Sequence, residues 1–123
     1  MALEEQVATA TPGELVGMLY DRAVRDLGGA SELFALEHDP RSKADAVHLV
    51  VHAQQIVAEL NNCLNVETGG DLAKNLSRLY EYVQYRLTEA VSKYDRNALN
   101  EARGLLVELG EAWNTMQNRQ KGD

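Results

Sequence analysis

The chain has 123 residues, of which 45% are hydrophobic and 25% charged, and its formal net charge is -7. These values are typical of one globular domain that is large enough to hold its own core. The excess of acid excludes a typical nucleic-acid binder, which needs clustered positive charge, and argues against docking on an anionic membrane. The single cysteine, Cys63, cannot form an intramolecular disulfide, which indicates a reducing compartment.

The sequence shows neither a targeting segment nor a membrane span. Its first residues, MALEE, are acidic and lack the basic and apolar regions of a signal peptide. No apolar run approaches the roughly 18 residues that a membrane-spanning helix needs. These features predict a cytoplasmic protein without direct membrane insertion.

Apolar residues recur at spacings of three and four along most of the chain, which predicts helices. The first helix begins at Thr11-Pro12-Gly13-Glu14, which provides a capping threonine, a proline for the first turn and a carboxylate where a capping box needs one. This helix is expected to span residues 12–36. Gly28 and Gly29 lie inside it and disfavour helix relative to alanine, so we expect a bend or a close helix contact there.

Capping signals also mark the other three helices. Asp39-Pro40 begins the second helix, whose wide apolar face predicts contact with more than one neighbour. Thr68-Gly69-Gly70-Asp71 ends it, and its aspartate can cap the third helix. Tyr94-Asp95 ends the third helix and can cap the fourth. The core residues expected on these helices are Leu49, Ile56, Leu60, Leu76, Leu79, Val83, Leu106 and Trp113.

Short loops between long helices imply that consecutive helices are antiparallel neighbours. The predicted fold is therefore all-α, an antiparallel up-down four-helix bundle with a short N-terminal extension. It forms a single domain over residues 1–123, with a flexible N-terminal segment (1–10) and a frayed polar tail (117–123). Because helical bundles can exchange elements between copies, the sequence leaves a homodimer open.

Few residues are arranged for catalysis or metal binding. His48 and His52 can face one side of a helix, but zinc needs three or four ligands, and no further histidine or cysteine lies nearby. A di-iron site would need Glu-x-x-His motifs, and the sequence has none. Cys63 has no basic neighbour to activate its thiol and is expected to be a small core residue. The sequence therefore favours a protein that is not an enzyme and has no cofactor and no metal.

The second predicted helix carries more apolar side chains than one core face needs. Val50, Val57 and Leu64 form a second row at seven-residue spacing beside the main core row. Such a row indicates either deep burial or a groove that receives a helix from a partner. Periodicity alone leaves both alternatives open.

The third predicted helix is rich in tyrosine. Tyr80 and Tyr82 are two residues apart and cannot share a face. At least one of Tyr80, Tyr82 and Tyr85 should therefore point away from the bundle axis. Tyrosine is enriched at protein interfaces because it buries a large area while keeping a polar end. This pattern fits both a partner-binding surface and packing at the core boundary.

Four blocks of the sequence, in this order and spacing, resemble the flagellin-specific export chaperones, the FliS family of the bacterial flagellar type III export system. Residues 9–15 read TATPGEL and lead into MLYD at 18–21. Residues 53–60 read AQQIVAEL, and residues 69–82 read GGDLAKNLSRLYEY, the most specific of the blocks. Residues 105–113 read LLVELGEAW.

This resemblance implies a helical bundle that binds the C-terminal segment of newly made flagellin, a segment that is disordered in the monomer. It further implies that the chaperone prevents premature polymerisation in the cytoplasm, and that the complex is received at the export gate by the membrane protein FlhA. No nucleotide or metal is implied.

Together, the surplus apolar rows and the resemblance predict a binding module whose apolar surface grooves receive helices of the partner. The residues predicted to bind the partner are Leu15, Leu19, Val50, Val57, Leu64, Tyr80 and Tyr82. Two other interpretations remain: an adaptor bundle that binds a different partner helix, and a metalloprotein that uses His48 and His52.

Overall fold

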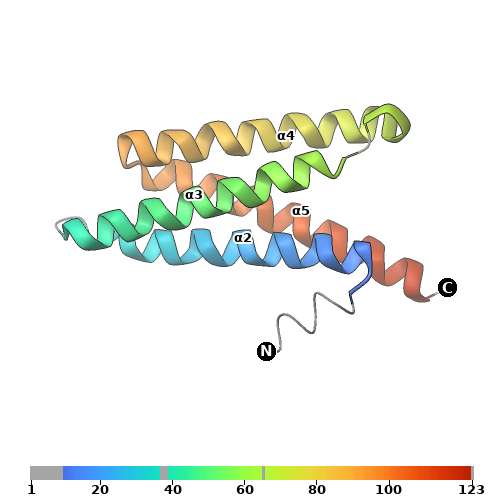
Figure 1. The fold of residues 1–123 in the computed structure, drawn as a ribbon, viewed down its shortest axis with the longest axis horizontal. Coiled ribbons are helices and arrows are strands. Elements are labelled where there is room, and N and C mark those ends of the chain that lie inside the picture. Colours follow the sequence, from blue (N-terminus) through green and yellow to red (C-terminus); the bar gives the residue numbers. More distant parts are fainter. Residues whose placement is uncertain (1–9, 37–38, 65, 123) are drawn as a thin grey trace.

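A computed structural model describes residues 10–36, 39–64 and 66–122. They form four helices, labelled in Figure 1: α2 (Pro12–Phe34), α3 (Pro40–Asn62), α4 (Val66–Lys93) and α5 (Arg96–Gly122). The described part of the chain contains no strand, so the all-α prediction is confirmed. Residues 1–9 of the predicted N-terminal segment lie outside the described residues.

Helix α2 begins as its sequence predicts. The Thr11 hydroxyl accepts a hydrogen bond from the Glu14 backbone N–H at 3.1 Å, and Pro12 occupies the first turn. The helix continues through Gly28 and Gly29, and the close helix contact predicted at this pair is found at Gly29. A Cβ added at Gly29 would lie 3.2 Å from Leu49 Cδ1 on α3. The helix ends at Phe34, slightly before the predicted end.

Helix α3 is capped by Asp39, as predicted. One carboxylate oxygen accepts from the Arg41 backbone N–H at 3.1 Å and the other from the Ser42 hydroxyl at 2.9 Å. These hydrogen bonds, led by that from Ser42, hold the pKa of Asp39 below its usual value. The helix ends at Asn62, well before the predicted stop at the glycine pair. Cys63 is its exposed C-cap. The prediction of a core cysteine was therefore wrong, because the last helical turn ends before this residue.

Helix α4 opens with a short turn that is broken from the rest of the helix at Gly70. This glycine has φ 59° and ψ -139°, a conformation that L side chains rarely adopt. At the other end, Tyr94 has φ 50° and Asp95 caps α5 as predicted. Its Oδ1 accepts from the backbone N–H groups of Asn97 and Ala98 at 2.9 and 3.2 Å. Helix α5 then runs through the tail that the sequence predicts to be frayed and ends at Gly122.

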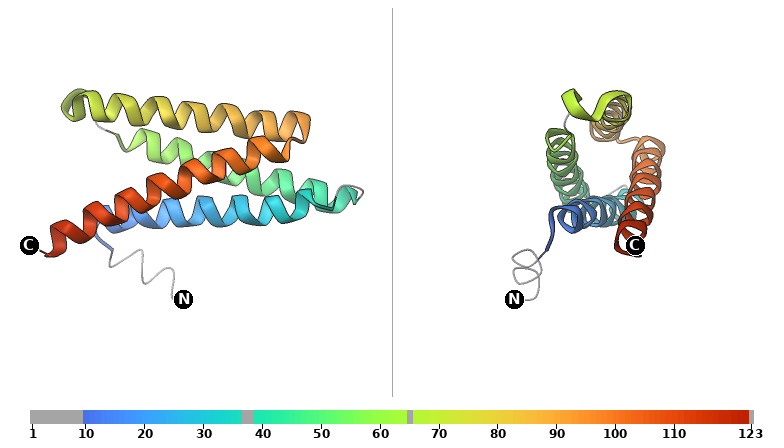
Figure 2. Two further views of the ribbon diagram at one scale, coloured as in Figure 1. Left: turned by 180° about the vertical axis from the view of Figure 1, so that it is seen from behind. Right: turned by 90° about the vertical axis from the view of Figure 1, so that its right-hand side faces the viewer.

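The helices form the predicted up-down bundle. Helix α2 packs against α3 and α5, and α4 packs against the same two helices from the opposite side. The end-on view in Figure 2 shows this arrangement around a common axis. In Figure 1, the starts of α2 and α4 and the ends of α3 and α5 lie at the same end of the bundle. This is called the open end below.

The core is drawn from all four helices. Its largest fully buried side chains are Phe34, Leu27, Leu87, Leu99, Leu106, Val50, Val57 and Val83. Among the predicted core residues, Ile56, Leu60, Val83 and Leu106 are buried, while Leu49, Leu76 and Trp113 are half-buried against the core. Leu79 is exposed, so its assignment to the core was wrong. None of the helices, over the described residues, is long and apolar enough to cross a membrane.

Candidate partner-binding surface

Three of the predicted partner-binding residues belong to the core. Val50 and Val57 are fully buried, and Tyr80 is almost so. The expectation that these three line a surface groove is therefore wrong for this structure. The physical reason is the position of α3 between α2 and α4. Its second apolar row is needed to pack against two neighbours, which is the deep-burial alternative that the periodicity left open.

Three further predicted residues are half-buried. Leu15 and Leu19 lie in the first turns of α2, and Leu64 lies just after α3. Leu19 and Leu64 pack against the core with part of their surface still accessible. The start of α2 and the end of α3, the elements that carry them, meet at the open end of the bundle although they are distant in sequence (Figure 1).

Helix α4 presents the most apolar exposed surface. Leu72 is 68% exposed, Leu79 37%, Tyr82 44% and Tyr85 59%. Leu72, Leu79 and Tyr82 are called the apolar face of α4 below, because 3.6 residues per turn place Tyr85 further round the helix. Tyr82 is the predicted site residue that the structure leaves exposed, and the contrast between buried Tyr80 and exposed Tyr82 confirms that the tyrosines cannot share a face. Sequence reasoning missed Leu72 and Leu79 because their spacing matches that of the core positions.

The path of α5 explains why this face is uncovered. Figure 2 shows α5 close to α4 at the turn that joins them and beside the start of α2 at the open end. There the Trp113 indole N–H donates to the Gly13 carbonyl at 2.9 Å. A Cβ added at Gly110 would lie 3.2 Å from Tyr20 Cβ, so this glycine lets α5 approach α2 closely. The first half of α4 is therefore left without α5 beside it.

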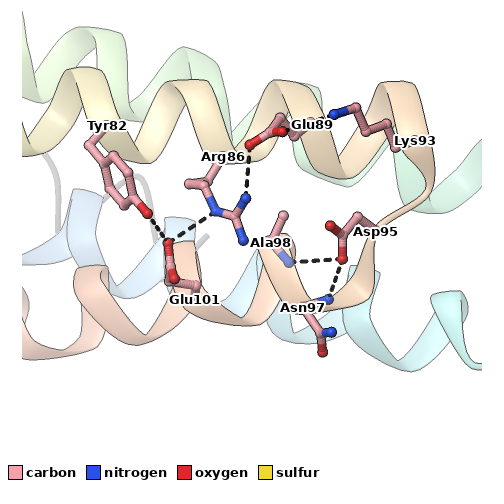
Figure 3. A network of polar contacts seen from close by, with 8 residues as sticks. All are labelled: Tyr82, Arg86, Glu89, Lys93, Asp95, Asn97, Ala98 and Glu101. Atoms are coloured by element: carbon pink, nitrogen blue, oxygen red, sulfur yellow. Dashed lines mark hydrogen bonds and ion pairs between the residues drawn. The ribbon is translucent and has the colours of Figure 1, made fainter.

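A polar network joins α4 to α5 next to the apolar face (Figure 3). Glu101 on α5 accepts hydrogen bonds from the Tyr82 hydroxyl and, at 3.0 Å, from Arg86 Nε. Arg86 also donates to Glu89 at 2.8 Å, and Glu89 pairs with Lys93 at 3.2 Å. The network thus ties the outer surface of α4 to the second turn of α5.

The pKa values in this network shift in the directions that its contacts require. The hydrogen bond to Glu101 raises the pKa of the Tyr82 phenol, because an ionised phenol could no longer donate to the carboxylate. The hydrogen bond from Arg86, and then that from Lys93, lower the pKa of Glu89. The hydrogen bond to Glu89 raises the pKa of Arg86.

A second polar contact crosses the core towards the open end. The hydroxyls of Tyr20 on α2 and Tyr80 on α4 form a buried hydrogen bond. Burial raises the pKa of both phenols, because the ionised form would lose its hydration. The pair therefore links two helices that lie diagonally opposite in the bundle, and it explains why Tyr80 faces inward.

A groove lies elsewhere, between α2 and α5. It has a volume of about 680 Å³ and is bordered by Arg25 and Glu32 from α2 and by Arg103 and Glu111 from α5. None of the predicted partner-binding residues lines it. Its charged border differs from the apolar groove that the sequence predicts.

The two histidines do not form a metal site with the residues described. His48 is exposed, and His52 Nδ1 is hydrogen-bonded to Asp26 Oδ2 on α2. Within the described ranges, no group of three or more histidine, cysteine, aspartate or glutamate side chains is placed to hold a metal ion.

Known proteins resemble this chain over nearly its whole length. The family model described as "Flagellar protein FliS" matches residues 2–120. The "Flagellar secretion chaperone FliS" of Salmonella typhimurium is 36% identical over 113 residues, 92% of this chain and 82% of the relative. "Flagellar secretion chaperone FliSB" of Pseudomonas aeruginosa is 34% identical, over 92% of this chain and 86% of the relative. The Bacillus subtilis FliS is 33% identical, over 89% and 78%. The chain therefore belongs to the FliS family of flagellar secretion chaperones.

Proposed function

We propose that this chain binds the disordered C-terminal segment of flagellin on the apolar face of α4, prevents its premature polymerisation in the cytoplasm, and delivers it to the export gate protein FlhA. The observation that carries the proposal is the uncovered apolar face itself, on a chain of this family. Soluble proteins rarely leave contiguous apolar surface without a use, and here Leu72, Leu79 and Tyr82 follow one another along the same helix.

The geometry of the face suits a helical partner. From Leu72 to Tyr82, α4 rises about 15 Å, at 1.5 Å per residue. A partner helix of about 10 residues would match this length and could place apolar side chains at three- and four-residue spacing against the face. Tyr82 offers aromatic area with a polar end, a composition typical of binding hot spots. The half-buried Leu15, Leu19 and Leu64 could extend the contact at the open end.

Binding of this kind couples folding to association. A disordered segment that becomes helical pays an ordering cost of about 2–5 kcal/mol, and the apolar area it buries must exceed that cost. Such a complex should therefore show a gain in helix and a negative heat-capacity change. A partner whose apolar face is occupied in this way cannot use the same face to polymerise, which links binding to the chaperone role.

The test is a calorimetric titration with a peptide from the flagellin C-terminus, with the N-terminal segment of the same flagellin as control. We expect binding of the C-terminal peptide alone, with a gain in helix measured by circular dichroism. Binding of neither segment would contradict the flagellin assignment and leave an adaptor for a different helix. For delivery, a pull-down with the soluble part of FlhA should recover the chaperone–flagellin complex, and its failure would contradict that step.

A further inference from the structure

The two exposed tyrosines of α4 are held very differently. The Tyr82 hydroxyl donates a hydrogen bond to Glu101 on α5. The side chain is therefore attached to α4 through its backbone and held at its hydroxyl end by α5. Tyr85 makes no hydrogen bond, ion pair or ring contact with any residue that the structure describes. The difference does not come from burial, because Tyr82 keeps 44% of its surface exposed.

The carboxylate that holds Tyr82 is itself held in place. The same Glu101 oxygen accepts from Arg86 Nε at 3.0 Å, and a second guanidinium nitrogen of Arg86 is engaged by Glu89 at 2.8 Å. Lys93 then holds the other oxygen of Glu89 at 3.2 Å. Figure 3 shows these side chains in one connected row. Each member limits the rotamers of the next, so the position of the Tyr82 hydroxyl is set by the whole row.

Resting on the proposed function, we propose that Glu101 is a positioning residue for partner binding, which holds the Tyr82 ring ready on the apolar face of α4. An anchor that is already ordered loses less side-chain entropy when the partner arrives. Glu101 needs no contact with the partner for this effect, because it acts through Tyr82.

The size of the effect follows from the freedom that the ring would regain. Immobilising a mobile side chain in an interface costs binding energy that corresponds to about a 2- to 12-fold change in affinity. Removing Glu101 should therefore weaken partner binding by about this factor. It should hardly change stability, because exposed ion pairs contribute little to it. If Glu101 served only as a structural link between α4 and α5, its removal would lower stability and leave the affinity for the partner unchanged.

The experiment compares calorimetric affinities for the flagellin C-terminal peptide, together with thermal midpoints, in the full chain. Glu101→Ala removes the acceptor, Glu101→Gln keeps an acceptor oxygen, and Tyr82→Phe keeps the ring but removes the donor. Glu108→Ala is the matched control, because Glu108 is an exposed glutamate on the same helix and pairs with no described residue. It also changes the net charge by the same amount as Glu101→Ala.

We expect Glu101→Ala and Tyr82→Phe each to weaken binding by about 2- to 12-fold. The variant that carries both substitutions should bind the peptide no more weakly than either single variant, because both substitutions remove the same hydrogen bond between Tyr82 and Glu101. Glu101→Gln should restore most of the affinity, and Glu108→Ala should bind as the parent does. Unchanged affinity in Glu101→Ala, or additive losses in the double variant, would overturn the positioning role while leaving the proposed function standing. A parent chain that binds no peptide would instead refute the proposed function, and this role with it.

Discussion

Replacing Leu72 with alanine should weaken partner binding and leave the fold nearly intact. Full burial of a leucine side chain is worth about 1.5–3 kcal/mol relative to its exposed state. Because Leu72 is 68% exposed in the free chain, about two-thirds of that value, roughly 1–2 kcal/mol, becomes available when a partner covers it. The variant should therefore lose about 5- to 30-fold in affinity for the flagellin C-terminal peptide.

The matched comparison is Leu87→Ala, on the same helix but fully buried. This variant should lose about 2–5 kcal/mol of stability, because it leaves a cavity in the core. Affinity is measured by calorimetry and stability by urea unfolding. If Leu72→Ala costs as much stability as Leu87→Ala, or leaves the affinity unchanged, the apolar face of α4 is not the binding surface described above.

Three further predictions concern the fold. Gly110→Ala should lower the thermal midpoint, because the added Cβ would lie 3.2 Å from Tyr20 Cβ. Gly104→Ala should instead raise stability by about 0.5–1 kcal/mol, because a Cβ at Gly104 would meet no atom within 4 Å. Equal effects in the two variants would contradict the close contact between α2 and α5. Asp95→Ala should cost about 1 kcal/mol in urea unfolding, because it removes the cap of α5, and an unchanged midpoint would show that the cap is dispensable. Burial raises the folded-state pKa of Tyr20 and Tyr80 above the unfolded value, so their contribution to stability is complete below about pH 10 and is lost as the pH rises further. Tyr80→Phe should flatten this alkaline loss in pH-dependent unfolding, and an equally steep loss in the variant would exclude the buried pair as its cause.

The starts of α2, α3 and α5 could be predicted from the sequence because their chemistry is local, whereas α4 begins at Val66 and not at the predicted Asp71. The caps at Thr11, Asp39 and Asp95 each use a side-chain oxygen to accept backbone N–H groups two or three residues away. The end of α3 could not be predicted in the same way. The glycine pair marks the strongest break in the sequence, but the helix ends earlier, at Asn62, and Gly70 instead breaks the first turn of α4.

The partner-binding surface could be predicted only in part, because exposure depends on how the helices cross. Val57 and Leu79 both occupy apolar rows at helical spacing, yet the first is fully buried and the second is exposed. Contacts distant in sequence decide between them. Helix α3 is enclosed by two neighbours, whereas Gly110 and Trp113 draw α5 towards α2 and away from the first half of α4. Tyr82 was identified because the spacing of the tyrosines is a local property.

The most direct measurement of the central claim is a leucine-methyl NMR titration of the chain with the flagellin C-terminal peptide. Leu36 provides an internal control, because it is 54% exposed at the far end of α2, away from the open end. We predict that the methyl signals of Leu72 and Leu79 shift with the bound fraction while those of Leu36 stay in place. Shifts at Leu36 with none at Leu72 and Leu79 would show that the partner binds elsewhere on the bundle and would contradict the account.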